Sequence, residues 1–172
     1  MGYKVVTIDG TSMSPTLKHR QGCLFETTLW GYGTEVGDIV DFILPQQTAA
    51  AKSSHVCKRI VAVAGDLVYA TEGVLYVNKE PSEYQGYGKT PNIQPLRVPR
   101  GRVYVLGDNR ACSFDSSDYG AVRRSKIKSR FLRKLKAKEV RLNKKQTKYR
   151  PRSFKSCYDM CLKEVYKKWG ID

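Results

Sequence analysis

Two runs of residues in this 172-residue chain carry side chains that together could perform nucleophilic catalysis. Ser12 lies in the run GTSMSPT (10–16), where a strand end would lead into a turn and expose a hydroxyl. A serine hydroxyl is a poor nucleophile until a base removes its proton. Lys58 lies in the run CKRIVAVAGD (57–66), and the two-residue period of a strand places it on the same side as the apolar Ile60. Because an apolar surrounding disfavours the ammonium form, Lys58 is the candidate base.

A third run, GDNRACSFDSSDYG (107–120), is a dense series of hydrogen-bonding side chains that follows a β-rich segment. Loops of this kind often hold a catalytic group in place. Taken separately, each of the three runs also fits a structural role: a Ser/Thr-rich turn, a strand-edge lysine whose stem reaches water, and an Asx-rich turn. A fourth run, GDIV (37–40), is interpreted as a turn that opens a strand.

Other reactive side chains are few or scattered. His19 and His55 are the two histidines of the sequence, so histidine-based catalysis has few candidates. The five cysteines are odd in number and irregular in spacing, which argues against a disulfide framework. Cys157 and Cys161 would share one face of a helix, but the sequence places no histidine and no second cysteine pair near them. We therefore expect neither a metal ion nor a cofactor.

The order of the four runs resembles the type I signal peptidase family, whose members are membrane-bound serine endopeptidases with a Ser/Lys dyad on a largely β fold. Within that family, three features are similar to subunit 2 of the mitochondrial inner membrane peptidase: GTSMSPTL (10–17), the cysteine before the Lys-Arg pair, and VPRGRVYV (98–105). Ser117, where bacterial enzymes usually have Arg, also fits that subunit. The run GDNR (107–110) is as much bacterial as mitochondrial.

The resemblance implies a role for each matching residue. Ser12 would be the nucleophile and Lys58 the general base. Ser113 would hydrogen-bond the Lys58 amine, and Asp115 would organise the surrounding loop. Since Ser117 replaces the usual arginine partner of Asp115, we expect Arg59 to be the only cationic neighbour of that carboxylate. The Ser12 backbone N–H would form the oxyanion hole, with a second donor from the backbone, water or Thr11.

The same resemblance implies removal of N-terminal signal or sorting peptides, with small side chains at positions −1 and −3 of the substrate. The expected partners are such precursor proteins, a membrane surface and a homologous peptidase subunit in a heterodimer. The expected location is the mitochondrial inner membrane facing the intermembrane space, with a bacterial plasma membrane or plastid membrane as the alternative. Family members carry an N-terminal anchor, whereas the nucleophile run starts at Gly10 here. We expect the anchor to be absent from this chain, truncated or replaced by that of a partner.

The elements that must position these residues are predicted to be mainly β-strands. Short runs rich in Val, Ile and Tyr recur between Gly, Pro, Asn and Asp through the first 120 residues. The predicted strands are Lys4–Ile8, Gly22–Trp30, Asp38–Leu44, His55–Val63, Leu67–Ala70, Val74–Val77 and Arg102–Leu106. The pair Glu72-Gly73 predicts a tight hairpin, and Asn78–Arg100 is interpreted as a long surface excursion.

The last third of the chain differs in charge. Residues 1–120 hold 12 Lys and Arg against 12 Asp and Glu, whereas residues 121–172 hold 19 against 4, which accounts for the net charge of +15. Such asymmetry indicates a tail that meets an anionic partner, either a lipid surface or nucleic acid. An alternative function is therefore a catalytically degenerate domain whose tail binds RNA or anionic lipid.

The predicted elements of this tail are helices. Apolar residues at near-helical spacing predict a helix over Lys126–Leu142, and a second is predicted over Ser156–Trp169. We therefore divide the chain into a catalytic domain at 1–122 and a basic, partly helical or disordered extension at 123–172. The longest apolar run, Ile60–Ala64, is far too short to cross a membrane.

Overall fold

The computed structural model describes residues 2–44, 55–136 and 139. It contains β1 (Tyr3–Thr7), β2 (Gly22–Thr27), β3 (Ile39–Ile43), β4 (His55–Val63), β5 (Leu67–Thr71), β6 (Val74–Val77), β7 (Glu80–Pro81), β8 (Ile93–Arg97), β9 (Arg102–Leu106), α1 (Ser116–Tyr119), β10 (Val122–Arg123), the 3-10 turn η1 (Arg124–Lys126) and β11 (Ile127–Lys134). The predicted mainly β class is confirmed, and β4, β6 and β9 have the predicted bounds. None of the described helices is long and apolar enough to cross a membrane. The helix predicted at Ser156–Trp169 lies outside the described residues.

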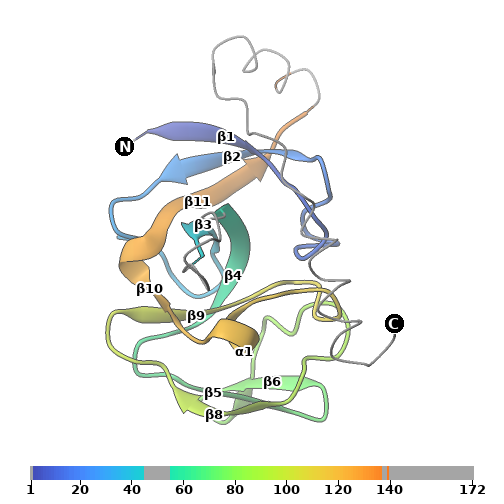
Figure 1. Cartoon of the computed structure of the whole chain (residues 1–172), viewed down its shortest axis with the longest axis vertical. Coiled ribbons are helices and arrows are strands. Elements are labelled where there is room, and N and C mark those ends of the chain that lie inside the picture. The colour runs from blue at the N-terminus through green and yellow to red at the C-terminus, as the bar shows by residue number, and fades with distance from the viewer. Residues whose placement is uncertain (1, 45–54, 137–138, 140–172) are drawn as a thin grey trace, which may run out of the picture.

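The described strands form two antiparallel sheets (Figure 1). The first has the order β1-β2-β11-β3-β4-β9-β10, and the second has the order β7-β6-β5-β8. One buried cluster joins the sheets, since Val61 and Tyr104 of the first pack with Val68 and Leu75 of the second. A further cluster packs the loop between β1 and β2 against the first sheet, with Met13, Leu17, Phe25 and Ile39 buried. The sites of Ser12 and Lys58 are therefore carried by a well-packed core.

The first sheet is strongly curled, as a polar contact across it shows. The Lys4 amine of β1 lies 2.6 Å from the Asp41 carboxylate of β3, although β2 and β11 separate these strands in the sheet. Asp41 is 2% exposed, and it also contacts His55 Nδ1 at 3.1 Å and accepts a hydrogen bond from Ser129 Oγ at 3.3 Å. One buried carboxylate thus connects β1, β3, β4 and β11. A buried charge of this kind is stable only with such partners.

The helix predicted over Lys126–Leu142 is wrong over residues 127–134, which form the strand β11. β11 lies between β2 and β3 and pairs with both, with Ser129 opposite Thr27 on one side and Asp41 on the other. The four-residue spacing of Ile127, Phe131 and Leu135 suits a helix, but four is also a multiple of the two-residue period of a strand. The strand is favoured over the helix because β2 and β3 both offer backbone groups with which β11 pairs. The sheet therefore continues past the domain boundary expected at residue 122.

The sequence predicted β5 and β6 of the second sheet but not β7 and β8. The predicted hairpin at Glu72-Gly73 is confirmed, because both residues have positive φ (53° and 88°) and connect β5 to β6. The segment 78–100, expected as a surface excursion, contributes the short strand β7 and the edge strand β8. β8 pairs with β5 although Pro95 lies within it, which an edge position permits.

Candidate active site

Ser12 lies in a loop whose ends are fixed by backbone hydrogen bonds. The Ile8 N–H donates to the Gln21 carbonyl at 2.9 Å, and the Arg20 N–H donates to the Ile8 carbonyl at 2.8 Å. Met13 and Leu17 are buried beneath the loop at 1% and 0% exposure. The apolar residues around Ser12 thus hold the loop against the sheet, while Ser12 itself is half-buried.

The loop that follows β9 is bonded to the nucleophile loop at two points. The Asn109 N–H donates to the Ser12 carbonyl at 2.9 Å, and the Asn109 side-chain amide donates to the Thr11 carbonyl at 3.2 Å. In addition, the Thr11 hydroxyl contacts the Cys112 sulfur at 3.7 Å. Asn109 therefore sets the relative position of the two loops, a role that the sequence analysis did not assign to it.

Lys58 is the buried member of a hydrogen-bonded chain. Its side chain on β4 is 2% exposed, and its amine donates to Ser113 Oγ at 3.0 Å. The Ser113 hydroxyl in turn donates to Asp115 Oδ2. The expected contact between Ser113 and the Lys58 amine is therefore present. A lysine held in this way has its amine fixed in direction, which proton transfer requires.

Gly107 brings Ser12 and Ser113 together. A Cβ built on Gly107 would lie 2.6 Å from the Ser12 carbonyl oxygen and 2.7 Å from Ser113 Cβ. Both residues therefore pack directly against the α-carbon of Gly107. Since Ser113 contacts the Lys58 amine, the three runs singled out in the sequence meet at one place.

Asp115 organises its loop through four acceptor contacts. Besides Ser113, its carboxylate accepts from the Gly107 N–H at 2.9 Å, from the Ser117 N–H at 3.1 Å and from the Ser117 hydroxyl at 2.9 Å. It is the N-cap of α1 and is 3% exposed. Ser117 thus provides two hydrogen bonds to the carboxylate. Asp115 has the organising position that the resemblance implied for it.

Arg59 contacts a different carboxylate from the one expected. Its guanidinium donates to both oxygens of Asp108, at 2.8 and 2.7 Å, and to the Gly37 carbonyl at 2.6 Å. The hydrogen bonds to Asp108 raise the pKa of Arg59. The expected Arg59 contact with Asp115 is therefore replaced by a bidentate pair with Asp108. The sequence run GDNR contained Asp108, but only the fold identifies its partner.

Cys57 and the two histidines do not compete for the role of nucleophile or base. Burial and the Asp41 charge raise the pKa of the Cys57 thiol, so it is protonated at neutral pH and a poor nucleophile. His19 accepts a hydrogen bond from the Gly10 N–H at 3.1 Å, and His55 contacts Asp41. Both imidazoles thus have structural partners away from the Lys58 amine.

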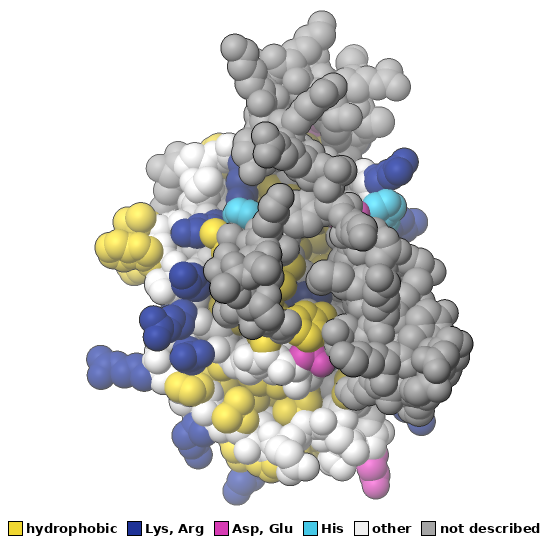
Figure 2. Space-filling view, viewed as in Figure 1, with side chains coloured by type: hydrophobic (Ala, Val, Ile, Leu, Met, Phe, Trp, Pro, Cys, Tyr) yellow, Lys and Arg dark blue, Asp and Glu magenta, His cyan; other side chains and the backbone are white. Residues whose placement is uncertain are grey.

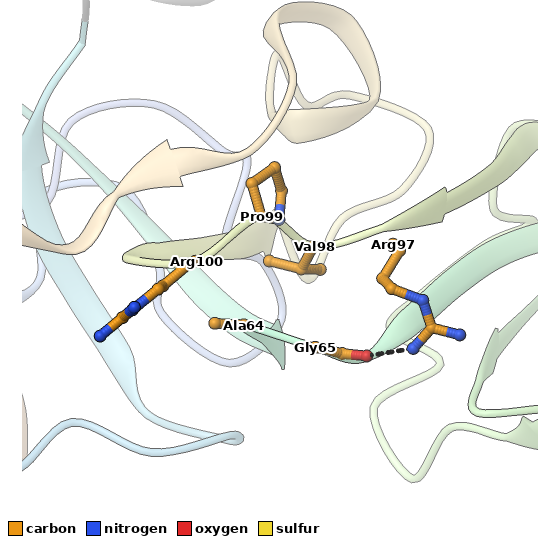
Figure 3. Close-up of a pocket in the computed structure, with 6 residues that line it drawn as sticks. All are labelled: Ala64, Gly65, Arg97, Val98, Pro99 and Arg100. Atoms are coloured by element: carbon orange, nitrogen blue, oxygen red, sulfur yellow. Dashed lines mark hydrogen bonds between the residues drawn. The ribbon is translucent and has the colours of Figure 1, made fainter.

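Two open pockets lie on the described surface at different distances from this site. One, of about 340 Å³, adjoins the nucleophile loop, with Pro15, Thr16, Arg59, Tyr84 and Asp108 in its lining. The other, of about 490 Å³, lies between the β4–β5 turn and the segment joining β8 to β9 (Figure 3). There the Arg97 guanidinium donates to the Gly65 carbonyl at 2.7 Å. Only the smaller pocket belongs to the candidate site.

Comparisons with known proteins place the chain in a family. A family model described as "Signal peptidase, peptidase S26" matches residues 2–133. The chain therefore belongs to the S26 signal peptidase family. The match extends through β11, in agreement with the place of that strand in the sheet.

Several curated proteins are similar to about two thirds of the chain or slightly more. Thylakoidal processing peptidase 1 of the Arabidopsis thaliana chloroplast is 35% identical over 130 residues, which are 66% of this chain and 36% of that protein. Signal peptidase I of Bacillus licheniformis is 31% identical over 127 residues, 66% of each chain. A probable signal peptidase I-2 of Synechocystis is 34% identical over 128 residues, 72% of this chain and 58% of that protein. The chain thus spans between about one third and two thirds of the length of these relatives.

A solved structure, that of a signal peptidase I from Enterococcus faecalis, is also similar. It is 25% identical, with a TM-score of 0.43, and the match covers 56% of this chain and 95% of the other.

Replacing Asp115 by Asn tests its organising role. We expect the free energy of unfolding to fall by about 2 kcal/mol, because an amide cannot accept from the Gly107 N–H, Ser113 and Ser117 at once. Peptidase activity should fall at the same time. Thermal denaturation and kcat/KM measure the two effects. Asp66→Asn is the matched control, since Asp66 also accepts from a backbone N–H but lies in the β4–β5 turn. Equal activity loss in both variants would contradict a specific role.

Proposed function

We propose that this protein is a serine endopeptidase that removes N-terminal signal or sorting peptides from membrane-targeted precursors, with Ser12 as nucleophile and Lys58 as general base. The observation that carries the proposal is the buried chain from the Lys58 amine through Ser113 to Asp115, beside the Ser12 loop. Membership of the S26 family and the names of the relatives support the reaction type.

In the first half of the reaction, the unprotonated Lys58 amine accepts the proton of the Ser12 hydroxyl as its oxygen attacks the scissile carbonyl carbon. An amine has one lone pair, so the hydrogen bond to Ser113 fixes an N–H and leaves the lone pair for Ser12. The Ser12 N–H has no acceptor among the described residues and is available to the oxyanion. The Thr11 hydroxyl contacts Cys112, which disfavours it as the second donor. The protonated Lys58 then gives its proton to the leaving amine.

In the second half, Lys58 is again the base. It removes a proton from a water molecule, whose oxygen attacks the ester formed on Ser12. The tetrahedral intermediate collapses, the C–O bond to Ser12 breaks, and the proton on Lys58 returns to the Ser12 oxygen. The released signal peptide carries the new carboxylate, and the enzyme regains its starting state.

The substrate can be held by main-chain pairing next to these two residues. β1 is an edge strand of the first sheet, and its chain leads directly to the Ser12 loop. On β4, the pairing with β9 covers Arg59 to Val63, so residues 55–58 have no β9 partner. An extended peptide that pairs with such an edge is a common mode of recognition. The preference for small side chains before the cut is carried over from the family resemblance.

The compartment in which the protein works and its partner subunit are also proposals. The described relatives come from a chloroplast and from bacteria, which supports the plastid or bacterial alternative over the mitochondrial inner membrane. A homologous partner subunit stays a prediction. The alternative of a degenerate domain that binds RNA or anionic lipid through its basic tail is disfavoured by the ordered Lys58–Ser113–Asp115 chain, which a binding domain would not require.

The test is cleavage of three precursor peptides, with bacterial secretory, thylakoid-transfer and mitochondrial sorting signals. The full chain in detergent should cut at least one of them at a single site after small residues, as mass spectrometry of the products would show. The preferred precursor identifies the compartment. Failure to cut any of the three, combined with salt-dependent binding of RNA, would support the binding-domain alternative instead.

A further inference from the structure

The second sheet carries none of the residues that we assign to the proposed reaction. It lies below the first sheet in the view of Figure 1. In Figure 2 the visible described surface of this lower part is mainly hydrophobic or uncharged, apart from charged side chains at its edges. Such a surface suits a structural role better than a site for a charged ligand. The β7–β8 loop (residues 82–92) nevertheless extends from this sheet to the residues that hold the Ser12 loop.

The Gln85 side chain fixes the β7–β8 loop to the second sheet. Its amide pairs with the backbone of Leu75 in β6, accepting from the N–H at 2.9 Å and donating to the carbonyl at 2.8 Å. It also donates to the Ser82 carbonyl at 2.7 Å. Further along the loop, the Thr90 N–H donates to the Gly73 carbonyl at 3.0 Å. The shape of the loop is therefore determined by β6 and by the hairpin between β5 and β6.

Tyr87 connects the β7–β8 loop to residues 108–110. Its N–H donates to the Asp108 carbonyl at 2.6 Å, and the Arg110 N–H donates to the Tyr87 carbonyl at 2.9 Å. Tyr87 thereby forms a parallel β-bridge with Asn109. Asn109 in turn donates its N–H to the Ser12 carbonyl at 2.9 Å. Residues 108–110 thus lie between the β7–β8 loop and the Ser12 loop and are hydrogen-bonded to both.

A buried guanidinium holds the same two segments together. The Arg110 side chain is buried, and it donates to the Tyr84 carbonyl at 2.5 Å and to the Thr90 hydroxyl at 3.2 Å. Gly86, with a φ of 76°, packs so closely that a Cβ there would lie 2.8 Å from the Asp108 carbonyl oxygen. Displacing the loop would leave the Arg110 donors buried without partners, which destabilises a protein. The contact between the loop and residues 108–110 is therefore a specific one.

Tyr84 adds a contact to the strand that carries Lys58. The Arg59 guanidinium of β4 lies over the Tyr84 ring, 5.3 Å from its centroid. A cation over the face of an aromatic ring is attracted to it, more strongly where water is excluded. The Tyr84 ring also packs against Gly37, where a Cβ would lie 2.7 Å from Tyr84 Cζ. Because the same guanidinium donates to both oxygens of Asp108, Tyr84 covers the ion pair that joins β4 to the loop after β9.

We propose that Tyr84 is a positioning residue for the reaction, which fixes the Ser12 loop relative to Lys58 by holding Arg59 against Asp108. Lys58 and Arg59 are neighbours on β4, so the Arg59–Asp108 pair joins the strand of the base to the residues that bind Ser12. The inference rests on the proposed function, because the rate that it affects is the rate of that reaction. Tyr84 also lines the pocket of about 340 Å³, so the competing explanation is that its ring holds the substrate.

Kinetics separate these two explanations. Tyr84→Leu removes the ring from Arg59 and should lower kcat at least roughly tenfold, because a small displacement of reacting groups is costly. KM for a signal-peptide substrate should change much less. Tyr84→Phe keeps a ring over Arg59 and should retain most of the wild-type kcat. Tyr69→Leu is the matched control and should leave kcat unchanged, since Tyr69 is a half-buried residue of β5 whose ring stacks on Tyr76.

Three kinetic results would overturn the inference. The first is an equal loss of kcat in Tyr69→Leu and Tyr84→Leu, which would indicate a general effect of loosening the second sheet. The second is a loss in Tyr84→Phe as large as that in Tyr84→Leu. The third is a raised KM with unchanged kcat in Tyr84→Leu, which would assign the ring to substrate binding.

Hydrogen exchange of single N–H groups tests the contact without any cleavage. In Tyr84→Leu the Asn109 N–H, which donates to the Ser12 carbonyl, should exchange at least roughly tenfold faster, as measured by NMR of the full chain. The control is the Val98 N–H, which donates to the Asp66 carbonyl at 2.8 Å and should exchange at the wild-type rate. Unchanged exchange at Asn109 would overturn the inference, as would equal acceleration at Val98. Faster exchange at Asn109 alone, with a wild-type protein that cuts no precursor, would support the contact and contradict only the proposed function.

Discussion

Ser12→Ala and Lys58→Ala are each expected to lower kcat/KM on a cleavable signal-peptide substrate by at least roughly 10³-fold. Ser12→Ala removes the attacking oxygen, and Lys58→Ala removes the group that activates it. Because the two residues act as one unit, the double variant should lose little more than either single variant. Steady-state cleavage assays measure all three proteins.

Two further lysine variants separate chemistry from folding. Lys58→Met keeps the volume of a side chain that is 2% exposed and should fold normally while remaining inactive. Lys58→Arg should also be inactive, because a guanidinium stays protonated and cannot accept a proton. Lys18→Ala, which truncates an exposed lysine near the nucleophile loop, is the matched control and should retain activity. Turnover of Ser12→Ala at the wild-type rate would overturn the proposed mechanism.

The Ser113 contact with the Lys58 amine and the loop-organising position of Asp115 were expected from the family resemblance, since Lys58 and Ser113 lie in different runs of the sequence. Local sequence alone correctly predicted the bounds of β4, the strand that carries Lys58. The pair Glu72-Gly73 between two strand-like runs also predicted the hairpin between β5 and β6. Such features need little knowledge of distant pairing.

The parts that could not be predicted depend on contacts between segments far apart in sequence. Arg59 and Asp108 lie in different runs, and only the pairing of β4 with β9 brings them together. The strand β11 looked helical because its apolar spacing satisfies both periods, and its partners β2 and β3 are remote in sequence. The sequence also did not single out Asp41 as a connecting residue, because its partners come from three other strands of the curled sheet.

Gly107 illustrates a residue whose importance comes from close approach. It is the first residue of the run 107–120, where a glycine would ordinarily be attributed to a turn. In the structure a methyl group at this position would meet the Ser12 carbonyl oxygen at 2.6 Å and Ser113 still more closely. The first of these is backbone, so relief requires a shift of the nucleophile loop itself.

Gly107→Ala should therefore lower kcat by about 10²-fold, the effect of displacing reacting groups by roughly 1 Å. The free energy of unfolding should fall by only about 1–3 kcal/mol, as is usual for one methyl group too many in a packed interior. Because the methyl group displaces the Ser12 loop and Ser113, both of which pack against Gly107, kcat should change more than KM. Gly2→Ala is the matched control, since a methyl group there would meet only the Thr27 hydroxyl at 3.3 Å. Wild-type kcat in a folded Gly107→Ala protein would show that the close packing of Ser12 and Ser113 against Gly107 is not needed for catalysis.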